Sequence, residues 1–147
     1  HPDASSPIDY FSHQRLLSVL PDTQGAGAAR VVLCTGKIGH ELQGERKKRK
    51  DESTAIVFVD QLYPFPEAEL TAELARHPDA REIIWVQEEP ANMGALPYML
   101  PRLRHIAGDR SVLSVKRSAS ASPSTGSAKA HEMEQKTLLS LAFSTKQ

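Results

Sequence analysis

Four short apolar runs, separated by longer amphipathic stretches, set the pattern of the chain. The runs are Arg30–Cys34, Ala55–Val59, Glu82–Val86 and Ser111–Val115. Runs of this length, rich in β-branched residues, are typical of strands that are buried on both faces. We therefore expect each run to form a strand of one sheet.

The stretches between the runs carry apolar residues at three- and four-residue steps, which predicts helices. The expected helices cover about Lys37–Lys50, Glu67–Arg76, Ala95–Ala107 and a final stretch after residue 127. In the final helix we expect one shared face formed by Ala130, Met133, Thr137, Leu138 and Leu141. Strands that alternate with helices predict a three-layer α/β/α, Rossmann-like domain with a mainly parallel sheet.

The first 29 residues have a different composition. They contain early prolines, a short amphipathic piece at Tyr10–Leu20 and a Gly- and Ala-rich stretch at Pro21–Ala29. Such a composition is typical of flexible connections. We interpret residues 1–29 as a linker and residues 30–147 as the domain, and the start at His1 suggests a segment of a longer polypeptide.

Charge and composition exclude several classes of partner. The 147 residues contain 18 basic and 18 acidic side chains, so no net field favours nucleic acid or a membrane surface. Cys34 is the only cysteine, which excludes an internal disulfide, and no apolar run reaches the roughly 18 residues that span a bilayer. We expect a soluble protein. The basic run Arg46–Lys50 fits a solvated helix end better than a nucleic-acid site, because no aromatic residues interrupt it.

Polar residues gather where the predicted strands end, and ligands of parallel α/β sheets bind at that edge. They are Thr35–Lys37, Asp60–Gln61, Gln87–Glu89 and Lys116–Arg117. No nucleophile with an orienting histidine and no cluster of metal ligands stands out, so we predict neither a catalytic nor a metal site.

Two positions at this edge allow alternative interpretations. Lys37 follows a strand and opens a helix, so the turn could bind a phosphate, or it is a tight turn with a solvated lysine. Arg117 and the serine-rich loop after it offer donors for an anion, or they form an ordinary connection.

The acidic pair that follows the third run suggests an interface. Adjacent residues of an extended chain point in opposite directions, so Glu88 and Glu89 cannot easily act on one substrate atom. We predict instead that Gln87, Glu88, Glu89 and Asn92 contact a neighbouring domain.

Several motifs, in order along nearly the whole chain, resemble the first component of the 2-oxoglutarate dehydrogenase complex. They are Gln61–Pro66 (Q-L-Y-P-F-P), Trp85–Ala95 (W-V-Q-E-E-P-A-N-M-G-A) and Ala119–Gly126 (A-S-A-S-P-x-T-G). The resemblance implies a transketolase-type C-terminal domain, with residues 1–29 as the linker from a pyrimidine-binding domain. It implies an enzyme that decarboxylates 2-oxoglutarate in the citric acid cycle and passes the succinyl group to lipoyl-lysine.

The same resemblance implies cofactors and partners. Members of the family are similar in holding thiamine diphosphate and magnesium between two preceding domains, so we expect this segment to bind neither and to be non-catalytic alone. The implied partners are the preceding domains, a second copy in a homodimer and the lipoyl-bearing succinyltransferase component. The implied location is the cytoplasm, or the mitochondrial matrix in a eukaryote.

Some relatives also have a site for an activating nucleotide, acetyl-CoA or AMP. On chemical grounds we predict Lys37 and Arg117 as the effector contacts. The family usually has Gly-Arg-Pro where this chain has Lys116–Ser118, and a histidine where Ala128 stands. Two alternatives remain open: a free-standing Rossmann-like nucleotide-binding module, or a relative that acts on another 2-oxo acid.

Overall fold

The computed structural model describes Ile8, residues 16–24 and residues 26–144. Its centre is a five-stranded sheet with the order β1-β3-β2-β4-β5. The strands are β1 (Val19–Leu20), β2 (Arg30–Cys34), β3 (Thr54–Val59), β4 (Glu82–Pro90) and β5 (Ser111–Arg117). All neighbouring pairs are parallel except β1 with β3. The predicted α/β fold class is confirmed.

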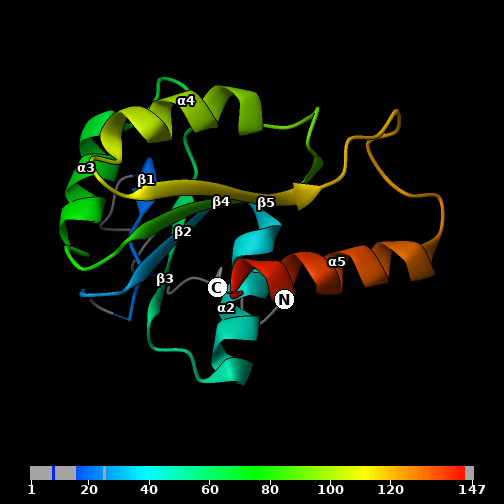
Figure 1. The fold of residues 1–147 in the computed structure, drawn as a ribbon, viewed down its shortest axis with the longest axis horizontal. Helices are drawn as coiled ribbons and strands as arrows, with labels where there is room; N and C mark the ends of the chain where they lie inside the picture. The colour runs from blue at the N-terminus through cyan, green and yellow to red at the C-terminus, as the bar shows by residue number, and fades with distance from the viewer. Residues whose placement is uncertain (1–7, 9–15, 25, 145–147) are drawn as a thin grey trace.

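The helices cover both faces of the sheet. They are α2 (Lys37–Arg49), α3 (Glu67–Ala75), α4 (Leu96–Ile106) and α5 (Ala128–Ala142). Figure 1 shows α3 and α4 on one side of the sheet and α2 and α5 on the other. The predicted helices α2, α3 and α4 are confirmed to within one or two residues at each end.

Alternation along the strands divides the core into two clusters. In β2, Val31 and Leu33 belong to the cluster beneath α3 and α4, whereas Val32 and Cys34 belong to the cluster facing α2 and α5. Successive side chains of a strand point to opposite faces, so a strand covered on both sides must be apolar throughout. Trp85 on β4 is the largest of the fully buried side chains.

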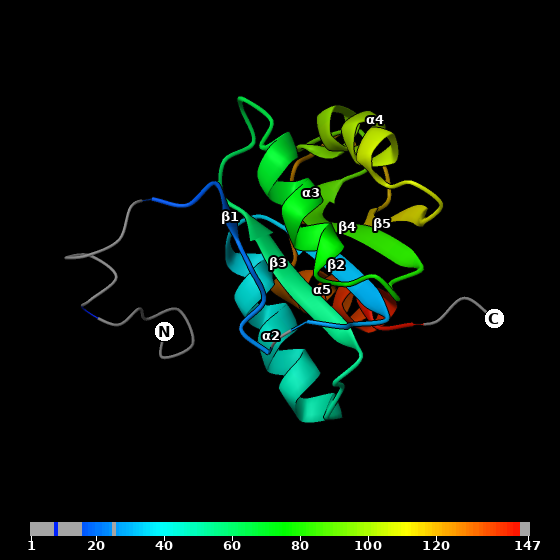
Figure 2. The same ribbon diagram turned by 90° about the vertical axis from the view of Figure 1, so that its left-hand side faces the viewer.

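A short antiparallel strand extends the sheet within the stretch that composition marked as a linker. Val19 pairs with Val59 and Leu20 with Phe58, so β1 lies beside β3 at one edge of the sheet (Figure 2). Tyr10–Arg15, most of the predicted amphipathic piece, lies outside the described residues. We name residues 16–24 and 26–29 the leading segment.

Two expectations are corrected. The third strand does not end at Val86 but continues to Pro90, and its pairing with β5 shifts register between these two residues. In α5 the buried residues are Gln135, Leu138 and Ala142, while Met133 and Leu141 are largely exposed. Of the predicted face, only Leu138 is among these buried residues.

Within the described residues, no helix is long and apolar enough to cross a membrane.

Candidate functional site

The strand order creates a switch point at the carboxyl edge of the sheet. From β2 the chain crosses through α2 to β3 on one side, whereas from β4 it crosses through α4 to β5 on the other. The chains leaving β2 and β4 therefore diverge, and ligands of open α/β sheets bind at such a place. Gly36 has a φ of 72°, a conformation that disfavours a side chain, and lets α2 begin at Lys37 directly after β2.

Side chains from α2, β4 and α5 meet at this switch point. The Lys37 ammonium contacts Glu41 one turn along α2 and lies 3.4 Å from Glu88 Oε1 on β4. From α5, Gln135 Nε2 donates to Glu41 Oε2 at 2.7 Å and to Glu88 Oε1 at 3.0 Å. One amide thus bridges two carboxylates that also share a lysine.

Arg117 at the end of β5 joins the same group through Gln135. Its Nη2 lies 3.2 Å from Gln135 Oε1 and 3.1 Å from His131 Nδ1, and its Nε lies 3.5 Å from Glu134 Oε2. We name the connected side chains the edge network: Lys37, Glu41, Glu88, Arg117, His131, Glu134 and Gln135. The structure therefore brings together the two residues that the sequence suggested, Lys37 and Arg117.

Lys37 and Arg117 differ in their access to solvent. The Lys37 side chain is 64% exposed, whereas the Arg117 side chain is 10% exposed and faces partners within the domain. The hydrogen bond to Glu41 raises the pKa of Lys37 against a smaller lowering by burial. Partial burial acts to raise the pKa of Glu41, but the hydrogen bonds from Lys37 and Gln135 outweigh it, so the pKa lies below its ordinary value. Lys37 and Glu41 are therefore both charged at neutral pH. Of these two cations, Lys37 is the more exposed.

The predicted interface residues have different surroundings. Gln87 is buried, and its Oε1 accepts from Trp85 Nε1 at 3.0 Å and from the Leu96 amide at 2.9 Å. Its Nε2 donates to the Met93 carbonyl at 2.8 Å. The Gln87 side chain therefore holds the β4–α4 connection inside the domain.

Asn92 connects two loops at the same edge. Its Nδ2 donates to the Ser120 carbonyl at 2.9 Å, and its Oδ1 accepts from the Ser120 amide at 3.1 Å. This pairing holds the serine-rich loop against the end of β4. Gly94 is close by with a φ of 69°, and an added Cβ there would lie 2.9 Å from Glu89 Cβ.

Four members of the edge network were not predicted as site residues: Glu41, His131, Glu134 and Gln135. Glu41 and Lys37 are four residues apart on α2, and His131 and Gln135 have the same spacing on α5. Residues at this spacing lie on one face of a helix. The four-residue spacing could have indicated that each pair shares one helix face. It could not reveal that these faces of α2 and α5 lie against each other.

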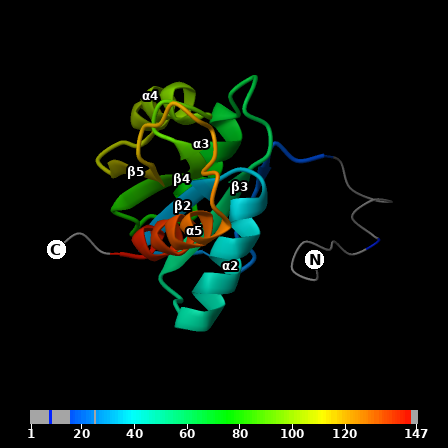
Figure 3. The same ribbon diagram turned by 90° about the vertical axis from the view of Figure 1, so that its right-hand side faces the viewer.

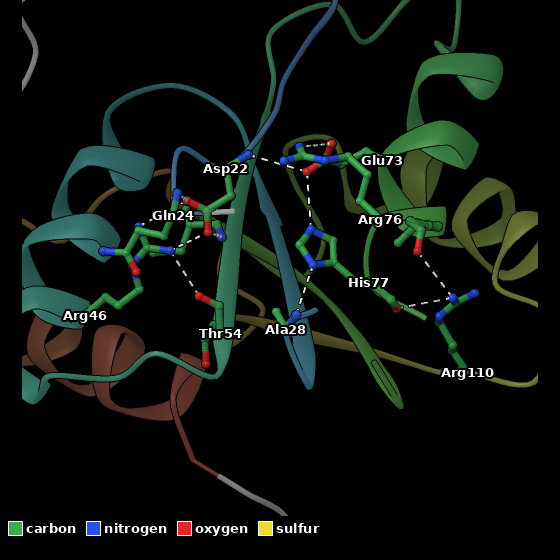
Figure 4. Close-up of polar contacts among 11 residues, drawn as sticks. Asp22, Gln24, Ala28, Arg46, Thr54, Glu73, Arg76, His77 and Arg110 are labelled. Atoms are coloured by element: carbon green, nitrogen blue, oxygen red, sulfur yellow. Dashed lines mark hydrogen bonds and ion pairs between the residues drawn. The ribbon is translucent and has the colours of Figure 1, made fainter. Parts of the chain in front are cut away.

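A second polar cluster lies away from this edge, beneath the leading segment (Figure 4). The Asp22 carboxylate pairs with Arg46 of α2 and accepts from the Ile56 amide at 2.9 Å. The Asp22 amide lies 3.4 Å from Glu73 Oε1, which is also 3.3 Å from His77 Nε2. We name Asp22, Arg46, Glu73 and His77 the anchor network.

His77, which lies just after the C-terminal end of α3, completes the anchor network. It is fully buried, and its Nδ1 accepts from the Ala28 amide at 3.1 Å, so Nε2 carries the proton that faces Glu73. These partners lie within one domain and fix the leading segment to α2, β3 and α3. The cluster is structural in character.

The described residues offer little covalent or metal chemistry. Burial raises the pKa of the Cys34 thiol to about 12, with a smaller contribution from the charge of Asp60. Among the residues that the structure describes, no group of three His, Cys, Asp or Glu side chains is arranged to hold a metal ion.

The fold and its polar switch point define a three-layer α/β domain with a mostly parallel five-stranded sheet. The family model for 2-oxoglutarate dehydrogenase C-terminal domains matches residues 5–143. The chain belongs to this family, and it is homologous to the C-terminal part of an enzyme, the E1 component of 2-oxoglutarate dehydrogenase. The resemblance seen in the sequence motifs is confirmed.

Individual relatives give the extent of the match. The 2-oxoglutarate dehydrogenase E1 component of Cupriavidus necator is 38% identical over 145 residues, which cover 96% of this chain and 15% of that protein. The E1 component of Geobacillus sp. is also 38% identical, with 100% and 16% covered. The multifunctional 2-oxoglutarate metabolism enzyme of Mycobacterium sp. (strain KMS) is 39% identical, with 95% and 12% covered. The chain thus spans a small part of the length of these relatives.

Proposed function

We propose that this domain supports the oxidative decarboxylation of 2-oxoglutarate, and the succinyl transfer to lipoyl-lysine, by a longer E1-type chain. The match of residues 5–143 to the family carries the proposal. In this view the active enzyme is a homodimer in the cytoplasm, or in the mitochondrial matrix of a eukaryote. It passes its product to the lipoyl-bearing succinyltransferase component.

We assign thiamine diphosphate and magnesium to parts of the longer chain outside this segment. The edge network combines two cations with three carboxylates, and each carboxylate already has a cationic or amide partner. Such a donor set does not fit the magnesium that accompanies a diphosphate, which needs oxygen ligands free to coordinate it. The role of the segment is then architectural, with Glu88, Glu89 and Asn92 facing the preceding domains.

We further propose that Lys37 contacts an anionic effector such as acetyl-CoA or AMP, with Arg117 behind it. The exposure of the Lys37 ammonium and its place at the first turn of α2 support this role. Arg117 acts through Gln135, because its guanidinium is largely buried. Its contribution is to hold the bridging amide in place.

The test is the 2-oxoglutarate-dependent reduction of an artificial electron acceptor by the longer chain with thiamine diphosphate and magnesium, beside the 147-residue chain. We expect activity from the longer chain and none from the 147 residues. Turnover by the 147 residues alone would contradict the proposal. Activity with another 2-oxo acid in place of 2-oxoglutarate would change the substrate but not the role.

The effector contact is tested in the same assay with acetyl-CoA. Lys37→Met is expected to raise the acetyl-CoA concentration that gives half-maximal stimulation. Lys47→Met is the matched control, since Lys47 is an exposed lysine near the other end of the same helix. Equal effects of both variants would remove Lys37 from the site.

A further inference from the structure

The edge of the sheet at β5 has no neighbouring strand within the described residues. The order β1-β3-β2-β4-β5 places β5 outermost, on the side of the sheet away from β3 (Figure 3). All seven residues of β5 are partly or fully exposed, whereas every residue of β2 and β3 is buried. Open edges of this length pair readily with another extended chain.

Two hydrogen bonds reveal which backbone groups of β5 point outward. The Ser111 amide donates to the Arg81 carbonyl at 2.9 Å, and the Arg117 carbonyl accepts from the Ala91 amide at 3.0 Å. Residues 111 and 117 therefore face β4, and alternation along the strand gives the same direction to residues 113 and 115. The amides and carbonyls of Val112, Ser114 and Lys116 consequently face away from the sheet.

A groove of about 460 Å³ follows this edge. Its lining combines apolar side chains with two cations and contains no carboxylate: Ile84, Leu100, Arg104, Val112, Leu113, Ser114, Val115, Lys116, Leu141 and Ser144. Leu141 is 50% exposed although it faces this apolar surface. Within the described part of the chain, neither Arg104 nor Lys116 belongs to an ion pair.

We propose that the β5 edge is a docking site for an extended peptide segment with alternating apolar and acidic residues, which adds a sixth strand to the sheet. The outward backbone groups of residues 112, 114 and 116 supply the ladder, and the groove takes the apolar side chains. Arg104 and Lys116 select carboxylates. A second copy of this chain fits less well, because two β5 edges would gather four cations around one groove without a counter-charge.

The direct test uses the 147-residue chain and two synthetic seven-residue peptides, one of alternating glutamate and valine and one of alternating lysine and valine. We expect the acidic peptide to bind at least about tenfold more tightly than the basic one. Amide hydrogen exchange is expected to slow at Val112, Ser114 and Lys116. Equal affinity for both peptides, or protection elsewhere, would overturn the proposal.

Two variants separate the backbone ladder from the charge. Ser114→Pro removes an outward amide that makes no bond to β4, so binding should fall by about tenfold while the thermal transition stays near that of the parent chain. Lys116→Glu should abolish the preference for the acidic peptide, because it leaves one cation and one carboxylate in the groove. If Ser114→Pro itself unfolds the chain, the Lys116→Glu result decides, and an unchanged preference would contradict the proposal.

The occupant is tested by sedimentation of the same chain without peptide. A concentration-dependent dimer that Lys116→Glu strengthens would show that a second copy covers the edge, and would overturn the proposal. A monomer that binds the acidic peptide supports it. These outcomes do not depend on any activity of the longer enzyme, so the inference and the proposed function can fail separately.

Discussion

The anchor network and the edge network use the same residue types in opposite ways. In the anchor network the paired Asp22 and Arg46 side chains are 2% and 3% exposed. In the edge network Lys37 is 64% exposed and its partner Glu88 is 27% exposed. A buried charge must be matched inside the protein because no water compensates it, whereas a surface charge remains available to an external partner.

This difference between the two networks shows that the number of ion pairs alone does not identify a binding site. Both networks contain an arginine, a histidine and carboxylates, and both connect several elements. The edge network stands out because it combines exposure with a switch point of the sheet. Helix α2 belongs to both, since Lys37 and Glu41 lie near its start and Arg46 lies near its end.

The largest expected effect is the loss of Asp22. Asp22→Ala leaves the buried Arg46 guanidinium without its carboxylate, and we expect the free energy of unfolding to fall by about 3–5 kcal/mol. Chemical denaturation of the purified chain measures this. Lys37→Ala is the control, and removing an exposed partner should cost about 1 kcal/mol or less. If the two variants lost similar amounts of unfolding free energy, the contrast between a buried structural network and an exposed one would be wrong.

The second prediction concerns the packing of the helix that joins the networks. An added Cβ at Gly39 would lie 2.2 Å from Phe58 Cε1, a buried ring. Gly39→Ala should therefore destabilise the chain by about 1–3 kcal/mol. At Gly44 of the same helix nothing lies within 4 Å of the added atom, and Gly44→Ala should stabilise by about 0.5–1 kcal/mol. A stabilising Gly39→Ala would show that Phe58 moves freely.

The smallest expected effect is the pH dependence of the edge network. Partial burial acts to raise the pKa of Glu41, but the hydrogen bonds from Lys37 and Gln135 give a net lowering from its ordinary value of 4.5. The folded state therefore binds this proton less readily than the unfolded state. The stability that ionised Glu41 contributes is fully present above pH 4.5 and is lost as the pH falls through the lower folded value.

Denaturation of the parent chain and of Glu41→Gln between neutral and acidic pH measures this effect. We expect the difference between the two free energies of unfolding to shrink as the pH falls. Gln135→Leu should weaken the pH dependence, since it removes one of the two hydrogen bonds. A difference that stays constant over this range would contradict the assigned partners of Glu41.

The sequence was sufficient for the parts of the fold that depend on local pattern. Runs such as Ala55–Val59 are apolar at every position because both faces of the sheet are covered, and their alternation with helical periods predicted the layers. Lys37 and Arg117 were predicted at the site because parallel strands end at one edge of a sheet. These inferences need only neighbouring residues and the geometry of a strand or helix.

Features that depend on distant partners were not predicted. Val19–Leu20 is too short to show a pattern, and it becomes a strand only because β3 offers an open edge. Gln135 was not among the residues of the predicted face, although it is buried. Its partners Glu41 and Glu88 lie 94 and 47 residues away, a relation that a helical period does not contain.

The antiparallel addition of β1 also has a mechanical consequence. A pull on the chain from before residue 16 reaches the domain through the two residues of β1 and then through Asp22, which is bound to Arg46 and the Ile56 amide. Force is thus received by α2 and β3 before it reaches β4 or β5. Because α2 also carries Lys37 and Glu41, we expect movements of the leading segment to be transmitted through this helix to the edge network.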